Sequence, residues 1–144
     1  VLAKMRSVDL DRVRVEKLVT VALAGRAADQ VLLGIADAAA SSDFAMATGL
    51  LVDAHHKWSL YDQILVFDVD LNNLHQLDQE TRASIEAMLQ TLMDRAQTIV
   101  RQHEAIIVAL AQTLVKARVI SGEALNKHLY ALLPGSIPAQ VVPS

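Results

Sequence analysis

The sequence predicts an all-α fold, a helical bundle of about five helices with one extended loop or short edge strand. Three features of the 144-residue composition support this prediction. Hydrophobic residues make up 53% of the chain and are mainly Ala, Leu and Val. Aromatic residues make up only 3%, which is typical of helices rather than sheets. Only five Gly and three Pro are present, so few turns can interrupt the helices.

The length fits a single domain, which we expect to span residues 1–133 and to bury its own core. Pro134, Gly135, Pro138 and Pro143 then predict a flexible tail over residues 134–144. The chain begins with Val rather than Met. We therefore expect it to be part of a longer protein.

Charge and hydropathy exclude several classes of partner. The net charge is −3 and the two signs are interspersed, so neither nucleic acid nor an anionic membrane is an expected partner. No apolar run approaches the roughly 18 residues that a membrane-spanning helix needs. The chain has no Cys, which excludes disulfides and thiolate chemistry and fits a cytoplasmic location.

Apolar residues at roughly helical spacing predict a first helix that begins near Leu10 and stops at Gly34. Gly25 lies within it and costs about 1 kcal/mol relative to Ala. Small neighbours make close packing against another helix the expected reason for this glycine. The neighbours are Ala22, Ala24, Ala27 and Ala28. The apolar positions are Leu10, Val13, Leu18, Val21, Ala22, Ala28, Val31 and Leu32.

A second helix is predicted over residues 42–57, starting at Ser41 or Ser42 with Asp43 in its first turn. Serine is a strong N-cap, and a carboxylate is favourable at the positive end of a helix. Trp58, Ser59 and Tyr61 end this helix. Its apolar residues along one side are Phe44, Ala47, Leu51 and Ala54.

The run over residues 63–69 alternates weakly and predicts an extended loop or one short edge strand. Asp68 and Asp70 follow, but the Gly and the closing Glu of a calcium loop are missing. A solvated loop is therefore the better interpretation than a calcium site.

A strong helix start at Asp78, with Glu80 in the first turn, opens an apolar repeat of more than thirty positions. This exceeds an ordinary helix, so a break near 101–104 is expected, giving helices over 79–101 and 103–118. A short helix follows Ser121 as N-cap, with Leu125, Leu129 and Leu132 facing inward. The apolar repeat consists of Ile85, Met88, Leu92, Ala96, Ile99, Ile106, Leu110 and Leu114.

The histidines do not form a metal site on their own. His55 and His56 are adjacent, about 100° apart on a helix, and cannot chelate one ion together, so each is expected at the surface or its boundary. His103-Glu104 begins like the zinc motif His-Glu-x-x-His, but Ile107 stands where the second His belongs. No complete catalytic site is visible in the sequence.

Several segments resemble the FtsH-type ATP-dependent zinc metalloproteases, in one consistent order over about residues 10–130. Residues 23–34, LAGRAADQVLLG, are similar to that family's LGGRAAEELVFG-type segment. Ser41-Ser42-Asp43, followed by Ala47-Thr48, resembles its ASND…AT segment. The stretches 57–60, 78–81 and 120–125 resemble later segments of the same family.

The resemblance implies that Asp43 descends from the third zinc ligand of this family. The other two ligands are the His pair of His-Glu-x-x-His, which would fall before Val1. Asp43 as a carboxylate that only complements the helix dipole is the alternative. Without the His pair and the Glu, we expect no zinc bound by this chain alone.

Two functional hypotheses follow. In the first, the chain is the C-terminal helical part of an FtsH-type peptidase domain, which in the full family cleaves protein or peptide substrates, forms homo-oligomers and is membrane-associated. In the second, it is a stand-alone, degenerate peptidase-like module for protein–protein interaction, with the small residues around Gly25 as one possible oligomer contact.

Overall fold

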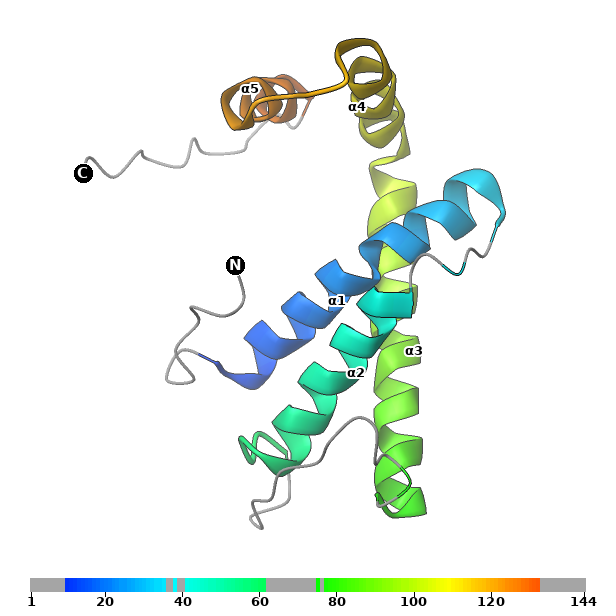
Figure 1. The fold of residues 1–144 in the computed structure, drawn as a ribbon, viewed down its shortest axis with the longest axis vertical. Helices are drawn as coiled ribbons and strands as arrows, with labels where there is room; N and C mark the ends of the chain where they lie inside the picture. Colours follow the sequence, from blue (N-terminus) through cyan, green and yellow to red (C-terminus); the bar gives the residue numbers. More distant parts are fainter. Residues whose placement is uncertain (1–9, 36–37, 39–40, 62–74, 76, 133–144) are drawn as a thin grey trace, which may run out of the picture. The chain divides into compact units, whose positions relative to one another are not determined.

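The computed structural model describes residues 10–35, 38, 41–61, 75 and 77–132. These residues form an all-α fold with five α-helices and one π-helical segment, as the composition predicts, and contain no strand (Figure 1). The predicted extended run over 63–69 and tail over 134–144 lie outside the described residues. The helices are α1 (Arg12–Ala28), η3 (Asp29–Leu33), α2 (Ser41–His56), α3 (Gln79–Gln102), α4 (Glu104–Ala117) and α5 (Gly122–Leu132).

Contacts along the backbone divide the chain into two compact units, one ending at Arg101 and one beginning at Gln102. The first contains α1, η3, α2 and nearly all of α3, and the second contains α4 and α5. The predicted limits of a domain over 1–133 stay predictions, because both ends of the chain lie outside the described residues. None of the described helices has both the length and the apolar character needed to cross a membrane.

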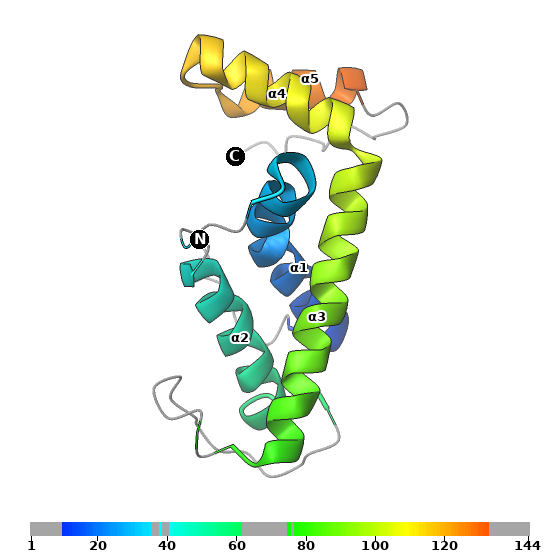
Figure 2. The same ribbon diagram turned by 90° about the vertical axis from the view of Figure 1, so that its right-hand side faces the viewer.

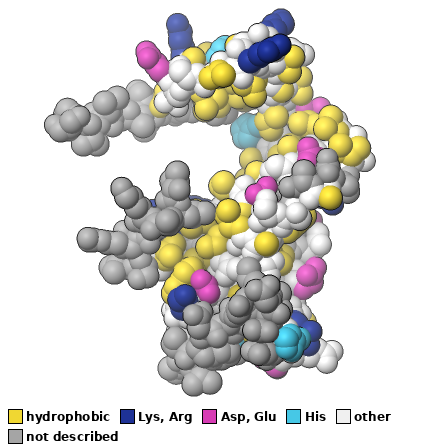
Figure 3. All heavy atoms as spheres, in the orientation of Figure 1, with side chains coloured by type: hydrophobic (Ala, Val, Ile, Leu, Met, Phe, Trp, Pro, Cys, Tyr) yellow, Lys and Arg dark blue, Asp and Glu magenta, His cyan; other side chains and the backbone are white. Residues whose placement is uncertain are grey.

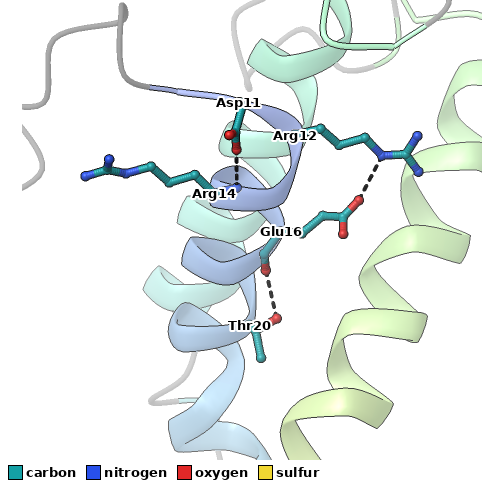
Figure 4. A network of polar contacts seen from close by, with 5 residues as sticks. All are labelled: Asp11, Arg12, Arg14, Glu16 and Thr20. Carbon is teal, nitrogen blue, oxygen red and sulfur yellow. Dashed lines mark hydrogen bonds and ion pairs between the residues drawn. The ribbon is translucent and has the colours of Figure 1, made fainter. Parts of the chain in front are cut away.

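The start of α1 is fixed by side chains of its own first turns (Figure 4). The Asp11 carboxylate accepts a hydrogen bond from the backbone N–H of Arg14 at 2.7 Å, which satisfies a donor that has no partner within the helix. Arg12 Nε forms an ion pair with Glu16 Oε1 at 3.0 Å, and the Thr20 hydroxyl donates to the Glu16 carbonyl at 2.7 Å. Local chemistry therefore sets this helix start.

The predicted stop of the first helix at Gly34 is confirmed. Beyond Ala28 the helix widens into the π-helical segment η3, and Gly34 follows with φ 67° and ψ 19°. Its backbone N–H donates to the carbonyl of Asp29. A side chain is disfavoured in this left-handed conformation, so glycine is the suitable residue.

The buried face of α1 consists of Val15, Val19, Leu23 and Ala27, spaced four residues apart. It packs alongside α2, whose buried side includes Ala47, Leu51 and Ala54 as predicted (Figures 1 and 2). Val13 and Val21, two of the apolar positions that predict this helix, do not lie on its buried face, because they are 58% and 72% exposed. They lie about 200° around the helix from Val15 and Leu23.

The predicted start of α3 at Asp78 is confirmed, because its carboxylate accepts hydrogen bonds from the Thr81 N–H at 2.8 Å and the Thr81 hydroxyl at 2.7 Å. Gln97 on α3 also donates to Gln30 in η3 at 2.9 Å. Ile99, a member of the predicted apolar repeat, is 43% exposed, whereas the next residue, Val100, is buried. The buried residues of α3 are Thr81, Ile85, Leu92, Met93, Ala96 and Val100.

The predicted break after α3 is confirmed, since His103 separates it from α4. In the second unit α4 and α5 pack on each other, and Ser121 caps α5 by accepting a hydrogen bond from the Ala124 N–H at 3.2 Å. The prediction that Leu125 faces inward is wrong, because it is 38% exposed. Leu129 is only half-buried. Two helices cannot enclose a side chain on all sides, and no described side chain of α4 or α5 is buried.

Replacing Gly25 and Gly34 with alanine tests the two glycines with one chemical change. A Cβ at Gly25 would lie 4.0 Å from Asp43 Oδ2, an ordinary contact distance. Gly25→Ala should therefore raise the free energy of unfolding by about 1 kcal/mol, the difference in helix propensity. Gly34→Ala should lower it by about 1 kcal/mol, because φ is positive there. Urea denaturation measures both, and equal signs would contradict the prediction.

A second pair of variants tests the buried face of α1. Leu23 is 1% exposed, so Leu23→Ala should lower the free energy of unfolding by about 2–5 kcal/mol through lost burial and a cavity. Val21→Ala should change it by less than about 0.5 kcal/mol, because Val21 is 72% exposed. Both are read from thermal or urea denaturation. A larger loss at Val21 than at Leu23 would refute the assignment of the faces.

Candidate functional site

Asp43, the predicted site residue, lies in the first turn of α2 and is half-buried. Its Oδ2 is 4.0 Å from where a Cβ of Gly25 would be. The carboxylate therefore lies against the part of α1 that has no side chain. Gly25 itself is exposed, and the distance leaves room for a methyl group, so the close backbone approach predicted at Gly25 is not found.

The neighbours of Asp43 and Gly25 in sequence hold the same region of the two helices together. The Arg26 guanidinium carbon lies 5.7 Å from the centroid of the Phe44 ring, within the range of a cation–π interaction. Arg26 is the residue after Gly25 and Phe44 is the residue after Asp43. The pairing of α1 with the first turn of α2 thus involves the Asp43 carboxylate beside Gly25 and a cation–π contact between Arg26 and Phe44.

A carboxylate in this position can complement the positive end of α2 or serve as a ligand for a cation. Among the described residues, no group of three or more His, Asp or Glu side chains is placed to hold a metal ion. His55 lies 12 residues along α2 from Asp43, which corresponds to about 18 Å at the rise of an α-helix. Asp43 therefore does not form a metal site with the histidines of its own helix.

The prediction that His55 and His56 lie at the surface or its boundary is wrong, because they are 8% and 1% exposed. After α2 the chain turns back, with Ser59 in a left-handed conformation at φ 47°. This turn brings the Tyr61 ring onto His55, with ring centroids 4.2 Å apart and an interplanar angle of 13°. The returning chain therefore covers the imidazole that a helix end alone would leave exposed.

Tyr61 also joins α2 to the start of α1. The Arg12 guanidinium carbon lies 4.9 Å from the centroid of the Tyr61 ring, while Arg12 Nε is paired with Glu16. Beside the cluster of Arg12, His55 and Tyr61 is a cleft of about 660 Å³ that also reaches the start of α3. The cleft is lined by Arg12, His55, Tyr61, Asp78, Glu80, Thr81, Ser84 and Met88.

Two titratable groups of this cleft, Tyr61 and Asp78, have structural roles. Burial raises the pKa of Tyr61 above its ordinary 10.0, with a further rise from Glu16 and an opposing effect of Arg12. The phenol is therefore neutral near pH 7 and acts as a stacking surface. The Thr81 N–H, and then the Thr81 hydroxyl, lower the pKa of Asp78, so that carboxylate is committed to capping α3.

Sequence reasoning missed this cluster because its members come from three separate elements. Arg12 is the first residue of α1, His55 lies in the last turn of α2 and Asp78 precedes α3, so no fixed spacing joins them. Only the capping role of Asp78 is encoded locally. The cluster connects helix ends, whereas Asp43 remains the candidate for binding chemistry.

Neither the comparison with protein-family models nor the comparison with curated proteins gave a match for this chain.

The capping role of Asp78 predicts a pH-dependent loss of stability in Asp78→Ala. Because the pKa of Asp78 is lowered below 3.8 in the folded chain, its stabilising effect is present above that value and is lost as pH falls through the folded pKa. Asp78→Ala should lower Tm at about pH 7, and the gap to the unsubstituted chain should shrink on acidification to about pH 3. Circular dichroism melts measure this gap.

Asp94→Ala is the matched control, because Asp94 is exposed on the same helix and its side chain accepts a bond from Gln90 at 3.3 Å. Its Tm should remain close to that of the unsubstituted chain. A Tm gap for Asp78→Ala that is independent of pH would show that the carboxylate charge is not responsible.

Proposed function

We propose that this chain is the C-terminal helical part of an FtsH-type zinc metallopeptidase domain and that Asp43 provides its third zinc ligand. The observation that carries the proposal is the position of Asp43. Its carboxylate lies in the first turn of α2, half-buried, with Oδ2 4.0 Å from the Cβ position at Gly25. Two of the segments that resemble this family, residues 23–34 and 41–48, meet at this point.

The chemistry of zinc agrees with such a role for Asp43. Zinc accepts a carboxylate oxygen together with two imidazoles and retains one position for water. A half-buried carboxylate in the first turn of a helix has fewer directions open to its oxygens than one on an irregular loop, which lowers the ordering cost of coordination.

The residues of this chain do not by themselves fit a zinc site, since one carboxylate cannot replace three ligands. The two His and the general base Glu would come from a preceding segment in a longer protein. We therefore expect the 144-residue chain alone to bind no zinc tightly and to hydrolyse no peptide. The longer protein would cleave proteins or peptides as a homo-oligomer, in the cytoplasm or at a membrane.

The test begins with the coding sequence before Val1, which should encode His-Glu-x-x-His about 40 or more codons upstream. The longer chain should then contain about one zinc per chain by plasma mass spectrometry. Asp43→Asn should lose most of this zinc, because an amide is a much weaker zinc ligand. Asp29→Asn is the control, because Asp29 is also half-buried and is four residues after Gly25, and this variant should retain the zinc.

Two results would contradict this proposal. A start codon before Val1 with no such motif would exclude the zinc role of Asp43. Metal-dependent cleavage of casein or a quenched peptide by the 144-residue chain, abolished by Asp43→Asn, would show that the partner ligands are already present.

A stand-alone module for protein–protein interaction is the second candidate, and one observation favours it. In the second unit no described side chain of α4 or α5 is buried, and several large apolar side chains are exposed. Exposed apolar surface of this kind is characteristic of interaction sites. The module would be non-catalytic and would act through this surface.

A further inference from the structure

The helix α4 has an unusual distribution of charge. Between Glu104 at its first position and Lys116 near its end, the eleven intervening residues carry no charge. Arg118, directly after the last helical residue Ala117, is the C-cap and has a left-handed conformation at φ 61°. The helix is therefore acidic at its start, uncharged along its length and basic at its end.

The apolar residues of α4 lie on both sides of the helix. Ile106, Ile107 and Leu110 are half-buried on one side. On the other side lie Val108, Ala111 and Val115, spaced three and four residues apart, which we call the α4 stripe. Val108 is 40% exposed and Val115 is 80% exposed. Figure 3 shows hydrophobic side chains at the surface of the region that Figure 1 labels α4 and α5.

A helix with apolar residues all round normally has neighbours on more than one side. An isolated helix of 14 residues is marginal in water, and most helical stability in proteins comes from packing of an apolar face. Among the described helices of its own unit, α4 packs with α5. The exposed α4 stripe would therefore be stabilised by packing against a further partner.

We propose that this partner is a second copy of the chain, bound through an antiparallel pairing of the two α4 helices about a twofold axis near Ala111. In this pairing Val108 of one copy faces the region of Leu114 and Val115 of the other. The small side chain of Ala111 lets the two helices approach closely at the axis. The interface is isologous, since each copy contributes the same residues.

The charges of α4 favour this arrangement. In an antiparallel pair, Glu104 of each copy lies beside Lys116 and Arg118 of the other, so that opposite charges meet at both ends. A parallel pair would place Glu104 beside Glu104 and Lys116 beside Lys116. The antiparallel pair also sets the positive end of each helix dipole beside the negative end of the other. This interface does not depend on the proposed role of Asp43.

The first experiment measures the mass of the full 144-residue chain in solution by light scattering over a range of concentrations. We expect a dimer that Val115→Asp weakens by at least about tenfold, because the substitution places a charge in the α4 stripe. Val21→Asp is the matched control, since Val21 is a valine of similar exposure, 72%, on α1. It should leave the dimer intact, and circular dichroism checks that both variants remain helical.

The orientation is tested by reversing charges. Glu104→Lys should weaken the dimer, because it places a positive charge beside Lys116 and Arg118 of the other copy. Adding Lys116→Glu and Arg118→Glu to the same chain should restore dimerisation, because opposite charges meet again. A parallel pair would gain nothing from this combination.

A crosslink tests the position of the axis, and the chain contains no Cys that could interfere. Ala111→Cys should form a disulfide dimer on mild oxidation, since two residues near a twofold axis lie within disulfide distance. Val21→Cys should not. A chain that is monomeric at every concentration, a dimer that Val115→Asp leaves unchanged, or a dimer that Ala111→Cys fails to crosslink would each overturn the proposal.

Discussion

The packing of α1 against α2 is the contact on which the first unit depends. Val15, Val19 and Ala27 of α1, and Ala47 of α2, are all 0% exposed. Small and β-branched side chains dominate this contact, so the two backbones run close together. This pairing also sets the positions of side chains at both ends of α2. It places Asp43 beside Gly25 at one end of α2, and at the other end it leaves His55 to be covered by Tyr61.

The ends of the helices could be predicted from the sequence because they depend on local chemistry. Asp78 and Ser121 cap helices through side chains three residues from their partners, and Gly34 stops a helix through its own backbone conformation. The inward face could not be predicted as well. In a chain so rich in Ala, Leu and Val, several helical registers look equally apolar, and Val13 and Val21 belong to a register that is exposed.

The candidate site also has one part that local sequence predicts, Asp43, and one part that depends on tertiary packing, the cluster around Tyr61. Asp43 was identifiable because a carboxylate after two serines marks a helix start, whereas its position beside Gly25 is known only from the structure. The cluster of Arg12, His55 and Tyr61 joins residues up to 49 positions apart in sequence, 12 to 61. Such a cluster exists only after α1 and α2 have packed and the chain has turned back at Ser59, so sequence spacing carries no sign of it.

An exposed valine alone does not identify an interface, and the two units show why. Val21 on α1 and Val115 on α4 are similarly exposed, at 72% and 80%. Single exposed apolar side chains are common on protein surfaces. Val21, however, belongs to a helix whose opposite face is already buried against α2, whereas α4 buries no described side chain and has no charge between Glu104 and Lys116. A further packing partner is therefore expected for α4 rather than for α1. The opposite charges at the two ends of α4 favour a second, antiparallel copy of the same helix.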